Sequence, residues 1–354
     1  NDFELMKHQV FVRNFLSFQT PYKNLLLYHG LGTGKTCSAI GICEEMRDYL
    51  NQMGIHKRII IIASPNVQEN FKLQLFDERK LFFENGTWKM NSCVGNKFLK
   101  EFNIKDLKKS KIIRKIKRII KSSYLFLGYE QFSNYISRKI DVSDKKRAIR
   151  KIKREFSNRL IVIDEVHNIR STDESPHKQV AQNLIKLVTH TENLKLLLLS
   201  ATPMFNSYKE IIWLINLMNM NDSRYPIKHS DIFDKDGFFK IDDSGAEVGK
   251  ELLIRKSTGY ISYIRGDNPY SFPFKIWPNM FLREKSIKSI AYPSKQMNGD
   301  NIDIGLELLD IYATNIGKYQ EKAYERILNT LGNDGGGIDM GYQMLEKPIQ
   351  ILNF

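Results

Sequence analysis

Apolar and polar residues form regular blocks along the first two hundred residues of the chain. Short apolar runs that predict buried strands lie at residues 24–30, 57–65, 122–130, 159–165 and 194–202. Apolar residues at helical spacing predict helices over residues 35–50, 67–76 and 177–190. Continuous apolar strands separated by helices predict a parallel sheet covered on both faces. We therefore expect an α/β fold whose functional edge is the carboxyl end of the strands.

The pattern becomes irregular after residue 220. Residues 268–281 are aromatic and interrupted by prolines, which predicts extended chain. Residues 305–331 predict a helix, and the glycines of residues 332–341 predict a loop. We expect a domain over residues 1–221 and an irregular linking region over residues 222–354.

Composition narrows the class of protein. The chain has 354 residues, of which 42% are hydrophobic, and this is not a disordered composition. No apolar run approaches the roughly 20 residues of a membrane helix. The start has no Met and no signal-peptide pattern, so we expect a trimmed piece of a protein. The odd number of cysteines fits a reducing, intracellular setting best. Cys37, Cys43 and Cys93 match neither a zinc site nor a disulfide framework, and we expect all three to be packing residues.

Two local blocks carry the formal net charge of +14. Residues 105–121 hold nine Lys and Arg against one acid, and residues 138–159 hold ten against three. In both blocks the apolar residues share one helical face, which predicts amphipathic helical insertions with basic outer faces. Three interpretations stay open: a surface that follows nucleic-acid phosphates, a face that is only solvated, or a docking surface for an acidic partner.

The stretch HGLGTGKT, residues 29–36, predicts a phosphate-binding loop between a strand and a helix. Glycines let backbone N–H groups approach a phosphate, and the helix N-terminus favours its charge. Lys35 would supply charge to the β- and γ-phosphates of ATP, and Thr36 would hold Mg²⁺ through its hydroxyl. The candidate nucleotide-binding residues of the loop are Gly30, Leu31, Gly32, Thr33, Gly34, Lys35 and Thr36. His29 stands where the strict pattern has its first glycine.

Another predicted strand ends in Asp164 and Glu165. Adjacent carboxylates at a strand end repel each other unless a cation is near. We expect Asp164 to hold Mg²⁺, and Glu165 to orient and deprotonate the water that attacks ATP. With Lys35, Glu165 is a candidate catalytic residue. His167 is a candidate coupling residue, and a purely structural histidine is the alternative.

The leucine run at residues 196–199 ends in Ser-Ala-Thr-Pro, which a strand that only fills a core does not need. The segments GLGTGKT, DEVH and SATP, in this order, resemble motifs I, II and III of superfamily 2 helicases and translocases. The resemblance implies a RecA-like sheet of the P-loop NTPase class with a DEAD/DEAH-like box. It also implies that Ser200 and Thr202 couple the nucleotide site to the nucleic-acid groove.

Three further segments fit this resemblance. Residues 4–9, ELMKHQ, are similar to the upstream glutamine motif, which implies that Gln9 reads the adenine base. Residues 63–71 and 127–132 are similar to the motifs that meet the sugar-phosphate backbone. The nucleic-acid contacts that this implies are Pro65, Asn66, Gly128 and Tyr129. The alternative is a surface glutamine in the first case and ordinary turns in the other two.

A narrower resemblance is to the helicase-like ATPases of large nucleocytoplasmic DNA viruses, including the poxvirus early transcription factor small subunit and nucleoside triphosphatase I. It rests on LLYHGLGTGKT, DEVHN, LLSATPMFNSYKEIIWLINLM and ISYIRGDNPYSFPFKIWP. It implies Mg²⁺-dependent ATP hydrolysis coupled to movement on nucleic acid or to its remodelling, with DNA favoured over RNA. It further implies a role in viral transcription, with a viral RNA polymerase or transcription-factor subunit as partner. The implied location is the viral factory in the host cytoplasm and the virion, with no membrane partner.

The family also needs a second RecA-like lobe, whose Q-x-x-G-R-x-x-R type motif brings an arginine to the γ-phosphate. This sequence contains no such motif. Because such an arginine contributes roughly 10³–10⁵ in rate, we expect the chain to bind ATP but to hydrolyse it weakly alone. The alternative function is a transcription-factor subunit that acts mainly as a DNA- or polymerase-binding module, with ATP as a switch.

Overall fold

The structure is a computed structural model that divides into two compact units, Asn1–Phe272 and Pro273–Phe354. The described residues are 4–105, 107–140, 144–169, 178–204, 208, 210–266, 286–288, 294, 301, 312–314 and 316–332.

A six-stranded parallel sheet forms the centre of the first unit. Its strands, in spatial order, are β5 (Tyr124–Leu127), β2 (Ile59–Ile62), β6 (Leu160–Ile163), β7 (Lys195–Ser200), β1 (Asn24–His29) and β8 (Ile261–Ile264). Every neighbouring pair is parallel, so the carboxyl ends of the strands lie along one edge. The four residues of β2 and of β6 are all buried, as expected for strands covered on both faces. This confirms the predicted α/β fold and five of its strands.

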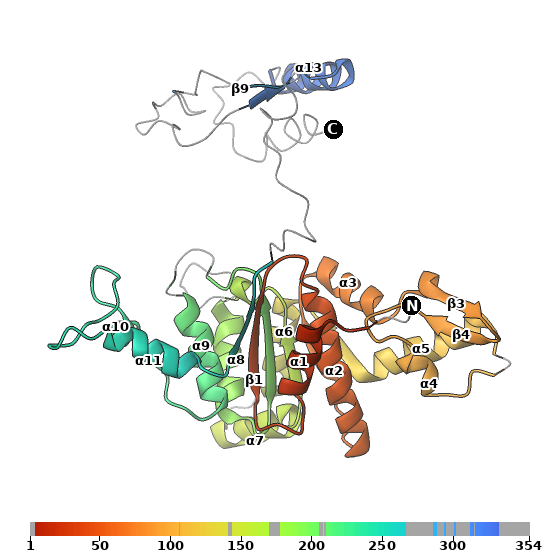
Figure 1. The fold of residues 1–354 in the computed structure, drawn as a ribbon, viewed down its shortest axis with the longest axis horizontal. Helices are drawn as coiled ribbons and strands as arrows, with labels where there is room; N and C mark the ends of the chain where they lie inside the picture. The colour runs from red at the N-terminus through yellow and green to blue at the C-terminus, as the bar shows by residue number, and fades with distance from the viewer. Residues whose placement is uncertain are drawn as a thin grey trace. The chain divides into compact units, whose positions relative to one another are not determined.

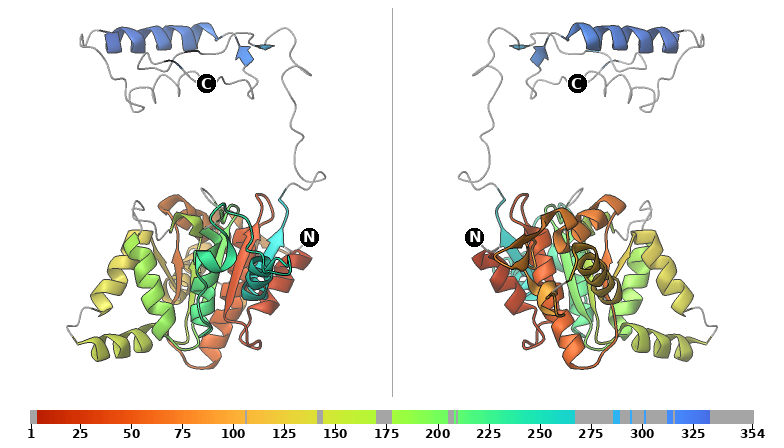
Figure 2. Two further views of the ribbon diagram at one scale, coloured as in Figure 1. Left: turned by 90° about the vertical axis from the view of Figure 1, so that its left-hand side faces the viewer. Right: turned by 90° about the vertical axis from the view of Figure 1, so that its right-hand side faces the viewer.

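Helices cover both faces of this sheet. One face carries α1 (Lys7–Phe15), α2 (Lys35–Gln52), α3 (Pro65–Leu75), α4 (Lys97–Lys100) and α5 (Lys109–Ser123). The other face carries α6 (Tyr129–Ile140), α7 (Lys145–Phe156), α8 (Lys178–His190) and α9 (Glu210–Asn221). Figure 1 shows α1 and α2 on one side of β1, with α8 and α9 on the other, and Figure 2 gives two side views. Alternate side chains of β1 enter the two cores, Leu25 and Leu27 one and Leu26 the other.

The first unit extends beyond the expected boundary at residue 221. After α9 the chain forms α10 (His229–Ile232) and α11 (Val248–Ser257), and a small apolar cluster joins α9 to α10. It then returns as β8, which pairs with Leu26–His29 of β1. β8 is an edge strand with alternating exposed and half-buried residues, so it lacks the continuous apolar run that predicted the other strands. The boundary between the compact units therefore lies later than expected.

The two basic blocks form helices on opposite faces of the sheet. Residues 109–121 of the first block lie in α5, which buries Ile112 and Ile116 in the same core as α2. The second block is divided: residues 138–140 end α6, and α7 begins at Lys145 behind the N-cap Asp144, which accepts a hydrogen bond from the Lys146 N–H. α7 buries Ile152 and Phe156 in the other core. The predicted amphipathic character is confirmed.

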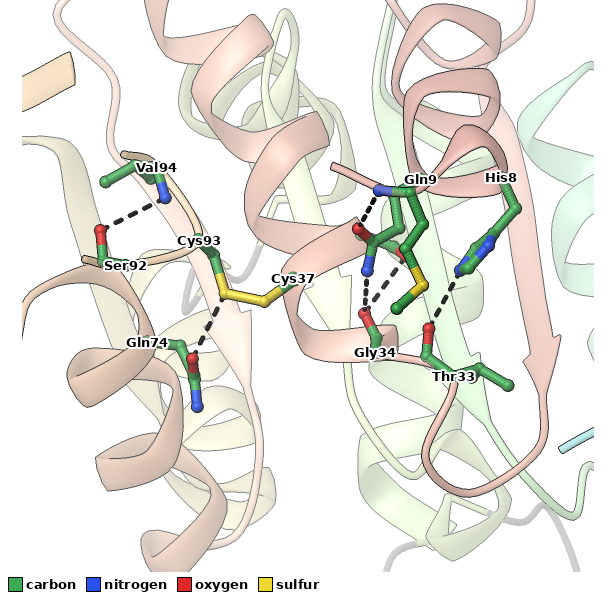
Figure 3. The surroundings of a disulfide bond; sticks show 11 residues. His8, Gln9, Thr33, Gly34, Cys37, Gln74, Ser92, Cys93 and Val94 are labelled. Atoms are coloured by element: carbon green, nitrogen blue, oxygen red, sulfur yellow. Dashed lines mark hydrogen bonds between the residues drawn. A yellow bond between two sulfur atoms is a disulfide. The ribbon is translucent and has the colours of Figure 1, made fainter. Parts of the chain in front are cut away.

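The expectation for the cysteines is wrong for two of the three. Cys37 and Cys93 form a disulfide, with their Cα atoms 5.3 Å apart (Figure 3). The two residues are 56 positions apart in the sequence, and only the packing of α2 against the 91–96 segment brings them together. Cys43 is buried and free, and burial raises the pKa of its thiol.

The remaining elements lie outside the central sheet and the helices that cover it. The first unit also has the 3₁₀ turn η1 (Glu78–Lys80) and the hairpin of β3 (Leu81–Glu84) and β4 (Thr87–Met90), which turns at Asn85 and Gly86. The second unit contains the antiparallel pair β9 (Ser286–Lys288) and β10 (Tyr312–Thr314), and helix α13 (Lys318–Gly332).

Some predicted segments fall on parts of the chain without a description. α13 confirms the predicted helix from residue 318, but the prediction is wrong for residues 312–314, which form β10 and pair with β9. Residues 305–311 and the segments 268–281 and 333–341 lie outside the described residues. No helix among the described residues is long and apolar enough to cross a membrane.

Candidate functional site

The phosphate loop leaves β1 at His29 and enters α2 at Lys35. Gly32 and Gly34 have φ of 76°, the left-handed backbone that glycine adopts without strain. Inside the loop, the Thr33 hydroxyl donates to the carbonyl oxygen of Gly30 at 2.8 Å. Lys35 Nζ donates to the carbonyl oxygen of His29 at 2.9 Å and to that of Gly30 at 3.3 Å. The loop residues predicted to bind nucleotide are thus brought together, with Leu31 exposed at the tip.

Helix α1 holds the far side of this loop (Figure 3). Gln9 is buried, its side-chain oxygen accepts from the Met6 N–H at 2.9 Å, and its amide donates to the Gly34 carbonyl at 3.2 Å. A Cβ on Gly34 would lie 2.5 Å from Gln9 Nε2, so this contact also needs a glycine at position 34. His8 Nε2 lies 3.0 Å from the Thr33 carbonyl oxygen. The sequence did not indicate His8, although it precedes the predicted Gln9.

Asp164 and Glu165 follow β6, two strands from β1. Burial and, after it, the negative charge of Glu165 raise the pKa of Asp164, which lies at about 6. The Glu165 N–H, which donates to Asp164 Oδ1 at 2.9 Å, and the positive charge of Lys35 act in the opposite direction. The charge of the phosphate loop therefore acts on Asp164, although β7 lies between β1 and β6 in the sheet.

Glu165 has a left-handed backbone, with φ 46° and ψ 52°, and it precedes the 3₁₀ turn η2 (Val166–Asn168). Such a conformation in a non-glycine residue costs about 1–3 kcal/mol and is concentrated at functional sites. The side chain of Glu165 keeps about a third of its surface exposed, so a water can reach this carboxylate.

The predicted coupling residues form one chain of contacts. Glu165 Oε2 lies 3.3 Å from His167 Nδ1, and the same nitrogen lies 3.0 Å from Ser200 Oγ. Ser200 Oγ accepts from the Thr202 N–H at 3.0 Å. The strand end of β7 is therefore joined through His167 to the carboxylate at the end of β6.

The predicted nucleic-acid contacts lie on the same edge of the sheet. Pro65 and Asn66 are exposed and open α3 after β2, where proline fits because the first helical N–H has no partner within the helix. Gly128 and Tyr129 follow the neighbouring strand β5. The Tyr129 hydroxyl donates to the backbone oxygen of Asp164 at 2.8 Å. Tyr129 is thus connected to the acidic pair as well as placed at the predicted surface.

The oxygen ligands expected for Mg²⁺ fit this site. Asp164 supplies a buried carboxylate, and the Thr36 hydroxyl has no hydrogen-bond partner among the described residues. Hydroxyl and carboxylate oxygens are ligands that Mg²⁺ prefers, together with phosphate oxygens and water. The described residues contain no cluster of three or more His, Cys, Asp or Glu that could hold a metal ion.

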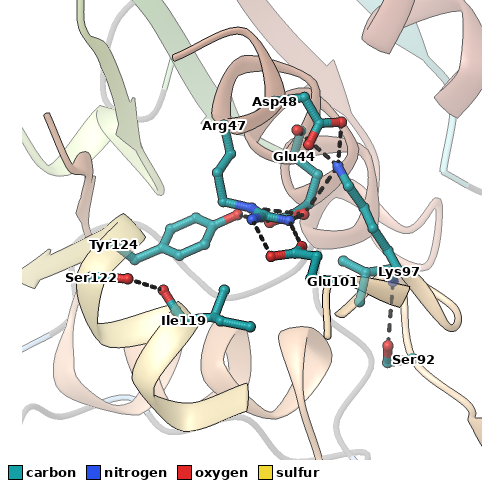
Figure 4. Close-up of polar contacts among 10 residues, drawn as sticks. Glu44, Arg47, Asp48, Ser92, Lys97, Glu101, Ile119, Ser122 and Tyr124 are labelled. Carbon is teal, nitrogen blue, oxygen red and sulfur yellow. Dashed lines mark hydrogen bonds and ion pairs between the residues drawn. The ribbon is translucent and has the colours of Figure 1, made fainter. Parts of the chain in front are cut away.

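A buried ionic network braces α2 behind the loop (Figure 4). Arg47 donates to both carboxylate oxygens of Glu44 and also to Glu101. Lys97 and the Tyr124 hydroxyl bond the same Glu44. Burial alone would raise the pKa of Glu44, but Arg47 and Lys97 hold it below its usual value. The network fixes α2, and with it Lys35 and Thr36, against α4 and β5.

The sequence model of the SNF2-related domain matches residues 8–254, which is more than half of the chain. The chain belongs to the SNF2-related domain family. This is a family of helicase- and translocase-type ATPase domains, which confirms the predicted enzyme class and nucleotide binding. The RecA-like fold agrees with the observed parallel sheet.

Viral proteins are similar to this SNF2-related domain. "Putative ATP-dependent RNA helicase L377" of Acanthamoeba polyphaga mimivirus is 25% identical over 299 residues, covering 78% of this chain and 24% of that protein. "Early transcription factor large subunit homolog" of African swine fever virus is 24% identical over 341 residues, covering 80% of this chain and 29% of that protein. The predicted resemblance to helicase-like proteins of large DNA viruses is confirmed. The chain spans about a quarter of the length of these relatives.

A solved structure also matches the chain. The Sulfolobus solfataricus SWI2/SNF2 ATPase core in complex with dsDNA is 15% identical, with a TM-score of 0.44, and the match covers 99% of this chain and 58% of that chain.

Proposed function

We propose that this SNF2-related domain is the ATP-binding lobe of a nucleic-acid-dependent ATPase that moves on DNA or remodels it, in viral transcription. The observation that carries the proposal is the joining of three strand ends. The phosphate loop after β1 interacts electrostatically with Asp164 after β6, and Ser200 of the intervening β7 contacts His167.

The residues of the site have separate roles in this proposal. Lys35 and the loop N–H groups bind the phosphates of ATP, and Gln9 holds the loop beside the adenine site. Thr36 and Asp164 would hold Mg²⁺, which neutralises phosphate charge when it is bound. Glu165 orients the attacking water and accepts its proton, since its carboxylate is accessible at the strand end.

The nucleic acid would cross the carboxyl ends of β2 and β5. Pro65 and Asn66 are exposed there, and Tyr129 connects this surface to the backbone of Asp164. Movement of a bound strand against Tyr129 would therefore reach the residues that position ATP. DNA is the favoured substrate because the resemblance indicates a DNA-virus transcription role, although the mimivirus relative is named as an RNA helicase.

A second candidate function is favoured by the African swine fever virus relative, which is named as an early transcription factor subunit homolog. In this alternative the domain binds DNA or a viral polymerase, and ATP acts as a switch. Both functions place the protein in the viral factory and the virion. In both, an arginine on a second RecA-like lobe would complete the catalytic site.

ATP hydrolysis separates the two functions. Phosphate release would be measured with and without double-stranded DNA, for the chain and for a longer form that includes the residues matching the second lobe. We expect DNA to stimulate turnover by the longer form, and we expect Glu165→Gln to abolish this turnover. Glu247→Gln, which changes an exposed carboxylate at the N-cap of α11, should leave it unchanged. Full biological activity of Glu165→Gln would favour the switch function.

A further inference from the structure

His29 is the residue by which this phosphate loop departs from the usual pattern, and the structure gives it a partner. It is the last residue of β1 and is fully buried. Its Nε2 lies 2.9 Å from Ser262 Oγ of β8, and its Nδ1 has no hydrogen-bond partner among the described residues. Burial, followed by the charges of His8 and Lys35, lowers the pKa of His29 to about 4, so the ring is neutral at pH 7. The Ser262 hydroxyl is therefore the polar anchor of this buried ring.

Gly30, the next residue, connects the loop to β8 through its backbone. Its N–H donates to the carbonyl oxygen of Ile264 at 2.9 Å. A Cβ on Gly30 would lie 2.3 Å from both Cα and N of Gly266, and a Cβ on Gly266 would lie 2.7 Å from the backbone of Gly30. Two backbones approach so closely here that neither position has room for a side chain. If Gly30 shifts, Gly266 must therefore shift with it, or the contact between the two backbones is lost.

The same two residues are bonded to the ammonium that is expected to meet ATP. Lys35 Nζ donates to the carbonyl oxygens of His29 and Gly30. A phosphate of ATP would compete for this ammonium with both carbonyls. Nucleotide binding would thus change the hydrogen bonding of His29 and Gly30, the two residues that contact β8.

We propose that His29 and Ser262 are positioning residues, through which a nucleotide at the phosphate loop sets the position of β8 and of Gly266 after it. The inference rests on the proposed function, because the loop must bind a nucleotide for the contact to respond. It explains why a histidine occupies the first position of this loop: its ring spans from β1 to the edge strand, which neither glycine nor alanine could do.

Hydrogen exchange followed by mass spectrometry tests the inference, with Mg²⁺ and the non-hydrolysable analogue AMP-PNP as the probe. In the unmodified chain we expect saturating AMP-PNP to change the exchange of amides in residues 260–266 as well as in the phosphate loop. In Ser262→Ala we expect the analogue still to bind, within about tenfold of the original affinity, since one neutral hydrogen bond is lost. The change at residues 260–266 should fall by more than half while the change at the loop persists. Ser262→Thr, which keeps the hydroxyl at a half-buried position, should restore it.

The controls separate this inference from the proposed function. Lys35→Ala should abolish binding of AMP-PNP, and unchanged binding would contradict the proposed function itself. Binding that depends on Lys35 but leaves residues 260–266 of the unmodified chain unaffected would overturn the inference alone. A full response in Ser262→Ala would overturn it too. Far-UV circular dichroism of each variant shows whether it is folded, and the result for the unmodified chain does not depend on any variant.

Discussion

Asp164 combines a buried position with a charge that its surroundings disfavour. Burial and the neighbouring Glu165 raise its pKa to about 6, although the Glu165 N–H and Lys35 partly offset them. A carboxyl group whose pKa is higher in the folded protein binds more protons there than in the unfolded chain at intermediate pH. Its contribution to stability is therefore greatest at acidic pH and is lost as the pH rises through 6. Ionised Asp164 therefore lowers the free energy of unfolding, and a bound cation would reduce this destabilisation.

Asp164→Asn should accordingly stabilise the protein at neutral pH. We expect the free energy of unfolding at pH 7.5 to rise by about 1–3 kcal/mol, the range given by a pKa raised by about two units. Most of the gain should disappear near pH 4, where the carboxyl of the folded protein is protonated and ionisation no longer destabilises it. Urea unfolding in metal-free buffer at both pH values measures this. Asp242→Asn is the matched control: hydrogen bonds from Ser244 and from backbone N–H groups lower the pKa of Asp242, so this change should not stabilise at pH 7.5.

Helix α2 is the element on which the site depends most. Its first turn carries Lys35, Thr36 and the disulfide-bonded Cys37, and its middle carries Glu44 and Arg47. The helix is thus fixed at one end by a covalent bond and in the middle by buried ions. Both constraints hold the phosphate-binding end of α2 in place.

The disulfide gives a prediction about redox conditions. Cys37→Ser should lower the free energy of unfolding by about 4 kcal/mol in oxidising buffer, because the bond closes a loop over 56 positions and restricts the unfolded chain. Dithiothreitol should remove the difference between the two proteins. Cys43→Ser leaves the bond intact, so dithiothreitol should lower its free energy of unfolding by about as much as that of the unmodified protein. Equal stabilities in oxidising buffer would show that the bond does not form in solution.

The ionic network gives a prediction about burial. Glu44→Gln should destabilise the protein by about 3 kcal/mol, because it leaves the buried Arg47 with an incomplete set of charged partners. Asp48 also pairs with Lys97, but its side chain is 44% exposed. We therefore expect Asp48→Asn to lower the free energy of unfolding by less than about 1 kcal/mol. Denaturant unfolding of both variants compares them. Similar effects for the two would contradict a buried, coupled network.

Several elements could be predicted because one physical signal determines them. Five strands are continuous apolar runs, and α2 follows a glycine loop with helical spacing. β8 could not be predicted in this way, because half of its side chains face away from the core and its partner β1 is more than two hundred residues away. The disulfide is also a product of tertiary packing, since nothing in the local sequence relates Cys37 to Cys93.

Across the whole first unit, the basic charge is divided between the two faces of the sheet. The exposed cations of α5 and of α7 belong to helices that pack on opposite cores. A single straight duplex is therefore not expected to contact both helices equally. The two basic blocks of the sequence are therefore two separate surfaces of the folded unit.

Salt dependence distinguishes the roles of these surfaces. If α5 binds nucleic acid, replacing Lys111, Arg114 and Arg118 by glutamine should reduce the slope of log affinity against log salt by about 0.9 for each phosphate that is no longer neutralised. The matched variant replaces the exposed Lys146, Arg150 and Arg154 of α7. We expect the α5 variant to have the larger effect, because α5 packs in the same core as α3, which begins with the predicted contacts Pro65 and Asn66. Unchanged slopes in both variants would contradict nucleic-acid binding by these helices. The basic surfaces would then be either solvated faces or docking surfaces for an acidic protein partner.

The site itself was more predictable than its surroundings. Lys35 and Thr36 begin α2 after the loop that follows β1, and Asp164 and Glu165 follow β6. Parallel pairing brings the ends of these strands to one edge, so the sequence positions of the four residues indicate that they lie there. The parts that support them were not predictable: His8 reaches the loop from another helix, and Ser262 reaches His29 across 233 positions. Their roles depend on side-chain geometry that no local pattern records.

The most direct test of the account is calorimetric titration of this chain with Mg²⁺ and ATP, beside Lys35→Ala. A matched control is Lys250→Ala, an exposed lysine of α11. We predict saturable binding of one nucleotide that Lys35→Ala abolishes and Lys250→Ala leaves unchanged, with little turnover during the titration. Absence of binding, or binding equal in all three proteins, would contradict the claim that residues 29–36 and Asp164 form a nucleotide site.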